Sequence, residues 1–397
     1  MNKKRLWLGI VICLLCLMPL TVVQAETARD LSKKCGYKIS SGSKKQRLYD
    51  GSYTKPFSTL KETNPYVQVK TPEGQPCYGL FIRWPYNAPP AWELQRYVEE
   101  TDVWETVKKG AEKPFAHEYI EVPGLERFRI TIPSDEKVSL KIAELTVLGE
   151  GELPADIQVW EPAPEKADLL LLSAHPDDEY IFMGGTIPYY AGELKKNVVV
   201  CYMTYASDLR RTELLNGLWH AGLRTYPVLG EFKDKYTNKL KAAYDLWGEK
   251  ESQDFVTGVI QTYRPEVMVT HDVDGEYGHG AHRLCADAAQ ICVKAAQTGD
   301  NPWQVKKLYL HLYDENQLKM DWRQPLEAFE GKTALQVAKE AFKFHKSQQG
   351  GSVKYRGKKY VFEVKDSGWF DNSLYGLAHT AVGLDVQKND FFENIGE

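Results

Sequence analysis

The stretch LLLLSAHPDDEY, residues 169–180, joins two features that decide the fold. Four consecutive leucines indicate a strand buried on both faces, which is typical of a parallel sheet. The strand stops abruptly at a proline and a group of polar residues, His175, Asp177, Asp178 and Glu179. Since ligand sites in open parallel sheets lie beyond the carboxyl ends of the strands, we expect these side chains to line a site.

The rest of this region has the alternation that a parallel sheet requires. Apolar runs at 197–205 and 265–272 also indicate buried strands. Helical patterns lie between the runs, at 180–194, at 210–223 and through residues 255–263. Strands that alternate with helices predict an α/β fold, here a Rossmann-like domain with a mostly parallel sheet.

A second polar cluster, THDVDGEYGHGAH at 270–282, follows the third apolar run. Because the carboxyl ends of parallel strands share one edge of a sheet, this cluster should meet the cluster around His175. His175, Asp178 and His282 then supply the three nitrogen and oxygen ligands of a catalytic Zn²⁺ site, whose fourth position stays open. The acids after the first strand could by themselves be solvated turn residues, and the histidines of the second cluster could by themselves be one face of a helix. The presence of both motifs together favours a metal site.

Two motifs, AHPDDE at 174–179 and GHGAH at 278–282, resemble the signatures of the PIG-L (LmbE-like) family of zinc-dependent N-acetylglucosaminyl deacetylases. The resemblance covers about residues 165–350. It implies hydrolysis of the acetamide of an N-acetylated amino sugar, with zinc on the three ligands given above. Asp177 is then the general base that takes a proton from the attacking water.

The same resemblance implies roles for further residues of the site. His279 would be a second active-site group that protonates the departing amine, and Tyr277 would contact the oxyanion. Arg210, in RRTE at 210–213, would bind the substrate. The neighbouring Arg211 is an open alternative for that role.

One position departs from the family pattern. Many relatives have an acid directly before the last histidine ligand, but here Ala281 precedes His282. A ligating histidine normally donates its second ring N–H to an acceptor, so another partner is needed. Asp272 or Asp274 is the expected substitute. Two further polar residues are expected to have structural roles only: Glu179, at a helix N-terminus, and His345.

Residues 31–150 predict a separate all-β domain of the sandwich type. LYDGSYTKPF at 48–57 and LKIAELTVLGEG at 140–151 resemble the galactose-binding-like (discoidin) jelly roll. A proline-bearing linker at 151–165 leads to the catalytic domain at 166–397. Four segments alternate apolar with polar residues as half-buried strands do: 78–84, 117–122, 127–132 and 138–149.

The N-terminal domain also contains three tryptophans whose placement the sequence leaves open. They could form a sugar-stacking platform or could fill the core of the sandwich. These residues are Trp84, Trp92 and Trp104.

Residues 1–25 have the pattern of a secretory signal peptide. Lys3, Lys4 and Arg5 precede an apolar run that ends in VQA at 23–25. We therefore expect a secreted, extracellular protein with no stable membrane span after cleavage. A retained membrane anchor is the alternative, since the apolar run is close to the shortest length that spans a bilayer.

Charge and cysteine content limit the possible partners. Without residues 1–25, 47 Lys and Arg stand against 54 Asp and Glu, a formal charge of −7, which is a poor match for nucleic acid. Cys35 and Cys77 could pair in an oxidising compartment. The other three cysteines of this part are expected to be buried free thiols: Cys201, Cys285 and Cys292.

Together these features predict an exported zinc-dependent N-deacetylase that acts on an N-acetylated amino sugar or glycan. The alternative is a carbohydrate-binding or adhesion protein whose α/β domain is catalytically inert. A nucleotide-binding Rossmann protein is excluded, because no GxGxxG follows the first strand and an acidic cluster would repel phosphates. The identity of the sugar and the oligomeric state stay open.

Overall fold

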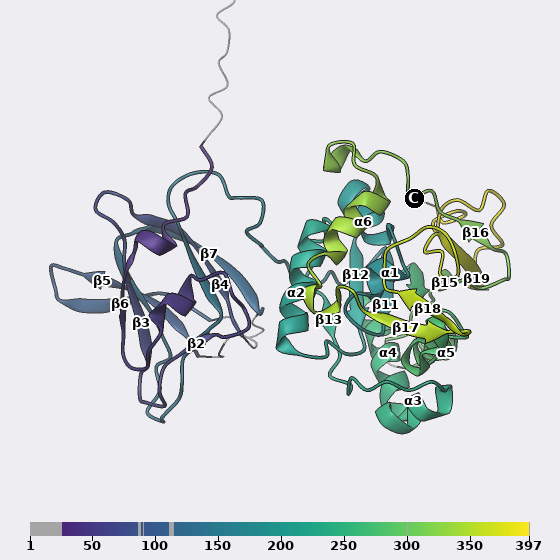
Figure 1. The fold of residues 1–397 in the computed structure, drawn as a ribbon, viewed down its shortest axis with the longest axis horizontal. Coiled ribbons are helices and arrows are strands. Elements are labelled where there is room, and N and C mark those ends of the chain that lie inside the picture. Colours follow the sequence, from purple (N-terminus) through teal and green to yellow (C-terminus); the bar gives the residue numbers. More distant parts are fainter. Residues whose placement is uncertain (1–25, 86–88, 90, 111–114, 300, 397) are drawn as a thin grey trace, which may run out of the picture.

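The computed structural model describes residues 26–85, 89, 91–110, 115–299 and 301–396. The predicted signal peptide therefore lies outside the described residues. Figure 1 shows an all-β part and an α/β part side by side, with helix α2 (Asp208–His220) of the α/β part facing the all-β part. Within the described ranges, no helix combines the length and apolar character needed to cross a bilayer.

Two antiparallel sheets make up the N-terminal part. Their strand orders are β1-β3-β8-β5-β6 and β10-β4-β7. Alternate apolar residues of both sheets, such as Val69 on β3 and Leu80 on β4, meet in one core, so the sheets form a sandwich. Its likeness to a galactose-binding module stays a prediction. The strands are β1 (Gly36–Ile39), β2 (Phe57–Ser58), β3 (Tyr66–Lys70), β4 (Cys77–Arg83), β5 (Glu93–Val98), β6 (Val103–Lys109), β7 (His117–Leu125), β8 (Arg127–Thr131), β9 (Lys141–Ile142) and β10 (Glu144–Leu148).

The tryptophans of the sandwich do not form an exposed platform. Trp84 and Trp92 are each 1% exposed and pack against each other with ring centroids 5.4 Å apart. Trp104 lies on β6 of the five-stranded sheet, where the guanidinium of Arg129 covers its ring at 4.4 Å. The interpretation as a sugar-stacking platform is therefore wrong for Trp84 and Trp92. The described cysteines are free thiols, including Cys35 and Cys77.

One seven-stranded mixed sheet forms the centre of the C-terminal part. Its order is β13-β12-β11-β14-β15-β19-β16, in which the first five strands are parallel and the last two antiparallel to their neighbours. Counted along the chain, the parallel strands have the order 3-2-1-4-5. The strands are β11 (Leu169–Ser173), β12 (Val198–Tyr202), β13 (Val228–Leu229), β14 (Val267–Thr270), β15 (Lys307–His311), β16 (Leu318–Lys319) and β19 (Leu374–Thr380).

Helices cover both faces of this sheet, which explains the uninterrupted leucines of β11. Leu169 and Leu171 enter the core on one face, whereas Leu170 and Leu172 enter the core on the other face. One face packs against α2, α1 (Asp178–Ile181) and α6 (Ala334–Phe342). The opposite face packs against α3 (Leu240–Trp247), α4 (Glu249–Tyr263) and α5 (Gly280–Ala295). The leucine run at 169–172 lies in β11, and the predicted strands at 197–205 and 265–272 contain β12 and β14. The predicted helices at 210–223 and 255–263 overlap α2 and α4.

The helix predicted at 180–194 is not continuous. The α-helix α1 ends at Ile181, and a separate π-helical segment, η3, spans Pro188–Glu193. Gly184 lies in the turn between them with φ +52°, a left-handed conformation that glycine adopts readily. A single periodic apolar pattern therefore conceals a turn between α1 and η3.

The two parts of the chain contact each other directly. Phe115 stacks on Tyr226 with ring centroids 4.4 Å apart, and the Tyr226 hydroxyl accepts a hydrogen bond from the backbone of Ala116 at 3.1 Å. Gln158 of the predicted linker donates to Asn216 of α2 at 2.7 Å. These contacts fix one face of α2 against the sandwich and the linker.

The turn at Gly184 yields a test of the fold. A Cβ at this position would lie 2.7 Å from Asn372 Oδ1 and 2.8 Å from Trp322 Nε1, and both neighbours are buried. We expect Gly184→Ala to lower the free energy of unfolding by about 2–4 kcal/mol, from backbone strain and overpacking together. Urea unfolding of the purified chain measures this loss.

Gly357, in the hairpin between β17 (Ser352–Tyr355) and β18 (Lys358–Val361), is the matched control. It also has positive φ, +78°, but no atom lies within 4 Å of a Cβ built there. Gly357→Ala should therefore cost only the strain, about 1 kcal/mol. Equal losses in the two variants would contradict the packing described at Gly184.

Candidate metal centre and catalytic pocket

The candidate site lies where the order of the parallel strands reverses. β11 and β14 are neighbours in the sheet, whereas the chain passes from β11 to β12 on the other side. Such a switch point leaves a crevice beyond the carboxyl ends of the two strands. His175 follows β11 and His271 follows β14, so both polar clusters predicted from the sequence reach this crevice.

The three predicted metal ligands come together around one carboxylate oxygen. Asp178 Oδ2 lies 3.0 Å from His175 Nδ1 and 3.3 Å from His282 Nε2. The same oxygen accepts a hydrogen bond from the backbone N–H of His175 at 2.9 Å, which closes the turn after β11. All three side chains are buried. The turn after β11, the start of α1 and the first turn of α5 therefore supply one compact donor set.

Two other imidazoles belong to overlapping clusters with metal-ligand spacing. These clusters are His175, His279 and His282, and Asp178, His271 and His282. His271 Nε2 accepts a hydrogen bond from the backbone of Ala174 at 2.9 Å, so its lone pair is already used. Burial lowers the pKa of His271, in agreement with a neutral ring that accepts at this nitrogen.

His279, like His271, accepts a hydrogen bond from the backbone. Its Nδ1 accepts from the backbone N–H of Ala281 at 3.1 Å, which caps α5. Burial lowers the pKa of His279, and the neighbouring His282 and His175 lower it further. A neutral ring with Nδ1 as acceptor carries its hydrogen on Nε2. The expectation that a protonated His279 delivers a proton to the amine does not fit this geometry.

The donor set fits a divalent cation. His282 Nε2 is buried and makes no hydrogen bond. Burial alone would lower the pKa of His282, but Asp178 and Glu276 outweigh burial and raise it to about 10. Burial also opposes the charge on Asp178, yet His282 and His175 hold the pKa of Asp178 well below its ordinary value. The cluster thus attracts positive charge, and two imidazoles with one carboxylate suit Zn²⁺.

Asp177 faces a different set of partners from its neighbour Asp178. Its backbone has φ +109°, an unusual conformation for a residue with a side chain. Its N–H donates to Glu179 Oε2 at 2.7 Å, and its Oδ1 accepts from Arg210 Nη2 at 2.9 Å. Burial, with Asp178 and Glu179, raises the pKa of Asp177, whereas Arg210 opposes the rise.

Glu179 therefore has a positioning role that the sequence did not reveal. One of its oxygens holds the backbone of Asp177, and the other accepts from His345 Nε2 at 3.0 Å. Both side chains of this pair are fully buried. His345, expected to be structural, thus supports the turn that carries the two aspartates.

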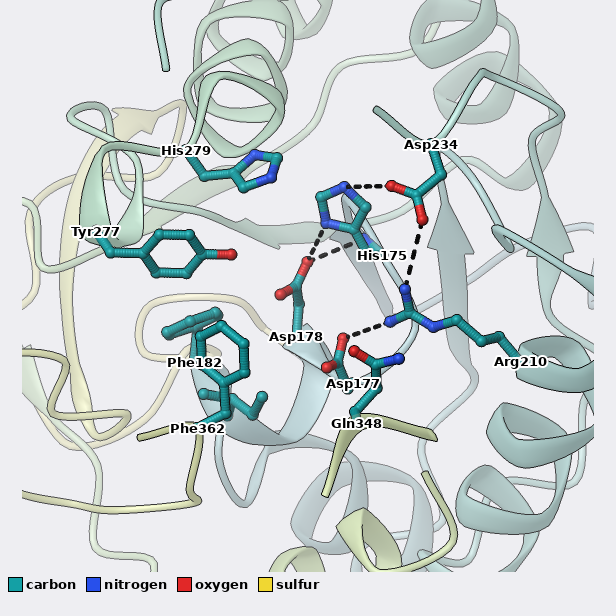
Figure 2. Close-up of a pocket in the computed structure, with 11 residues that line it drawn as sticks. His175, Asp177, Asp178, Phe182, Arg210, Asp234, Tyr277, His279, Gln348 and Phe362 are labelled. Atoms are coloured by element: carbon teal, nitrogen blue, oxygen red, sulfur yellow. Dashed lines mark hydrogen bonds and ion pairs between the residues drawn. The ribbon is translucent and has the colours of Figure 1, made fainter. Parts of the chain in front are cut away.

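A cavity of about 110 Å³ lies beside His175, Asp177 and Asp178 (Figure 2). Tyr277 and His279 project into it from one side and Arg210 from the opposite side. Burial, with Asp178 and Asp177, raises the pKa of Tyr277 well above its ordinary value, so the phenol keeps its proton. Five further lining residues were not predicted, because they lie far from the motifs or are apolar: Ile181, Phe182, Asp234, Gln348 and Phe362.

Comparison with known proteins identifies the family of this region. Residues 170–293 match the family PIG-L, described as GlcNAc-PI de-N-acetylase. Residues 170–293 form a PIG-L domain. The matched segment runs from β11 into α5 and contains all seven site residues predicted from the sequence.

Two curated relatives are named 1D-myo-inositol 2-acetamido-2-deoxy-alpha-D-glucopyranoside deacetylase. The protein from Streptomyces avermitilis is 28% identical over 175 residues, and that from Rhodococcus opacus is 32% identical over 174 residues. Each match covers 36% of this chain and 60% of the relative's length. The solved N,N'-diacetylchitobiose deacetylase from Pyrococcus horikoshii is 20% identical, with a TM-score of 0.35. This likeness covers 46% of this chain and 71% of the solved chain.

The PIG-L domain orients His282 with a residue other than those expected. Glu276, which is 0% exposed, accepts from His282 Nδ1 at 2.7 Å. The prediction that Asp272 or Asp274 supports His282 is wrong, because Asp272 Oδ1 accepts from the backbone of Asp274 at 3.0 Å. Glu276 precedes Tyr277, whose left-handed backbone (φ +47°) turns the chain back towards α5. Sequence spacing alone does not reveal such a reversal.

The structure also separates the two arginines of the PIG-L domain that the sequence left open. Arg210 lines the cavity, where its guanidinium lies 3.6 Å from Asp234 in addition to its bond with Asp177. Arg211 instead donates to the Pro85 carbonyl of the sandwich at 3.3 Å. Only Arg210 is placed to meet a substrate in this cavity.

The role of Glu276 can be measured through metal affinity. Glu276→Gln removes one acceptor oxygen and places an N–H against the histidines, so His282 loses its fixed tautomer. We expect zinc affinity to fall about 10- to 100-fold, measured by competition with a chromogenic chelator. Asp272→Asn is the matched control and should leave the affinity unchanged. An affinity loss in Asp272→Asn, with none in Glu276→Gln, would contradict the assignment.

Proposed function

We propose that the chain is an exported zinc-dependent hydrolase that removes acetyl groups from N-acetylated amino sugars of a glycan or glycoconjugate, of the N-acetylglucosamine type. The observation that carries this proposal is that the adjacent carboxylates of Asp177 and Asp178 have different contacts. Asp178 contacts His175 and His282, whereas Asp177 faces the cavity beside Arg210. The PIG-L match and the names of the relatives support the reaction class.

His175, Asp178 and His282 would hold the metal. A divalent cation bound there would polarise the amide carbonyl and lower the pKa of a bound water. Asp177 would accept the proton of the attacking water and return it to the departing nitrogen. One residue can perform both transfers, because the amine leaves only after the water has given up its proton.

Two donors on the opposite wall would stabilise the negative charge of the tetrahedral intermediate. Tyr277 presents a phenol that stays protonated. His279 presents its Nε2–H, because its Nδ1 is occupied by the backbone of Ala281. Donors that are already fixed in place need no reorganisation when the charge develops. In this proposal His279 donates a hydrogen bond as a neutral ring.

The small cavity suits an acetamide group and not a whole saccharide. Phe182 and Phe362 provide apolar surface for the acetyl methyl group, and Arg210 would bind a sugar hydroxyl at the mouth. The remaining sugar would lie outside the cavity. Export through residues 1–25 belongs to the same proposal, since a glycan substrate is met outside the cell.

Substitution of the two aspartates tests this account. Asp177→Asn should keep zinc while kcat falls by about 10²–10⁴, the usual contribution of a general base. Asp178→Asn should instead lose zinc affinity, because a ligand is replaced by a neutral amide. The measurements are acetate release from N-acetylated sugars, with and without a chelator, and elemental analysis for zinc. Zinc loss in Asp177→Asn with retention in Asp178→Asn would show that the roles are exchanged.

A further inference from the structure

A second and larger cavity lies between the two parts of the chain. Its volume is about 800 Å³, and we call it the boundary cavity. The sandwich contributes Arg83 and residues 51–54, and the linker contributes residues between 155 and 158. The α/β part contributes one side of α2 and the segment 344–347. The boundary cavity therefore exists only where both parts of the chain meet.

Arg83 is the unusual residue of this cavity. It ends strand β4, and its side chain is only 8% exposed. Its Nε is buried without a hydrogen bond, and among the described residues no carboxylate lies within ion-pair distance of its guanidinium. The guanidinium packs instead over the rings of Phe81 at 4.3 Å and Tyr53 at 5.4 Å. Glu144, the cross-strand neighbour of Arg83 on β10, and Asp156 act on this charge only from beyond ion-pair distance. An anion bound in the cavity would therefore stabilise the buried guanidinium.

The surroundings of Arg83 suit a sugar. Tyr53, Trp219 and Phe344 line the cavity, and aromatic faces are common platforms for pyranose rings. Arg224, a further lining residue, lies 3.9 Å above the ring of Trp219 and adds positive charge. Planar guanidinium groups bind carboxylates through two parallel hydrogen bonds.

The acidic residues of the boundary cavity leave Arg83 available. Both carboxylate oxygens of Glu213 accept from Ser347, from its backbone at 2.8 Å and from its hydroxyl at 2.6 Å. Asp156 is exposed and makes no ion pair with Arg83 within 4.0 Å. A ligand carboxylate can therefore reach Arg83 without displacing a partner.

The boundary cavity shares a wall with the catalytic pocket. Leu209 lines the boundary cavity and Arg210 the catalytic pocket, and Ser347 and Gln348 are divided in the same way. Consecutive Cα atoms are about 3.8 Å apart, so only a thin layer of chain separates the two. A saccharide that occupies the boundary cavity would lie beside the site of hydrolysis.

We propose that the boundary cavity is a second saccharide site that takes an acidic sugar, with the sugar carboxylate bound by Arg83. The choice of a saccharide rests on the proposed function, whereas the need for an anion rests on Arg83 alone. The N-terminal sandwich would then contribute directly to the choice of glycan, through a cavity that neither part forms by itself.

Trigalacturonate is the probe, because it carries carboxylates and no N-acetyl group. It cannot be deacetylated, so its binding is independent of the hydrolytic reaction. Its methyl ester has the same sugars without the charges and is the matched control ligand. Isothermal titration of the zinc-loaded chain should show binding of the acid and at least tenfold weaker binding of the ester.

Three variants locate the binding. Arg83→Met keeps the length of the side chain and should weaken trigalacturonate binding by about 10- to 100-fold, the value of a charged hydrogen-bonded pair. Arg96→Met removes an exposed arginine of β5, ion-paired with Glu105 at 2.8 Å, and should leave binding unchanged. Ala155→Trp fills part of the cavity from an exposed position and should also weaken binding.

The outcomes separate this proposal from the proposed function. Arg83→Met should melt at the same or a higher temperature than the parent, and should still release acetate from a small N-acetylated sugar. Equal binding of acid and ester, or unchanged binding in both Arg83→Met and Ala155→Trp, would overturn the acidic-sugar site. An absence of binding at millimolar trigalacturonate would also overturn the acidic-sugar site. If acetate release fails while Arg83-dependent binding persists, the proposed function is wrong and the anion site stands.

Discussion

The site depends on one buried carboxylate that holds three imidazoles. Glu276 lies 2.7 Å from His282 Nδ1, 2.9 Å from His271 Nδ1 and 2.6 Å from His311 Nδ1. These rings come from α5, from the end of β14 and from the end of β15. Burial opposes the charge, but the histidines, His271 first, hold the pKa of Glu276 well below its ordinary value. The network fixes the crevice at the switch point and leaves His282 Nε2 directed at Asp178.

The same principle separates Asp177 from Asp178. Two adjacent carboxylates in a buried site would repel each other unless each had its own partners. Imidazoles surround Asp178, whereas Arg210 faces Asp177 and Glu179 holds its backbone. The turn at the end of β11 therefore directs Asp178 to the histidines and Asp177 to the cavity. Residues that touch no substrate, such as Glu179, maintain this separation.

The sequence predicted those parts of the structure that follow from local pattern. The leucines of β11 indicated a strand buried on both faces, and the ends of β11 and β14 converge as parallel strands require. Two features could not be predicted from the sequence, because each depends on a residue whose backbone φ is positive. Gly184 breaks the helix predicted at 180–194, and Tyr277 turns the chain so that Glu276, not Asp272, supports His282. The boundary cavity depends on how two separate parts pack, which no local pattern encodes.

The central claim is that His175, Asp178 and His282 form the metal site. Anomalous X-ray scattering at the zinc edge, from crystals of the full chain grown with zinc, tests it most directly. We expect one strong peak at about 2.0–2.2 Å from a nitrogen of each histidine and an oxygen of Asp178, with His271 and His279 outside bonding distance. A peak bonded to His271 or His279 in place of these ligands, or no peak in the crevice, would contradict the account.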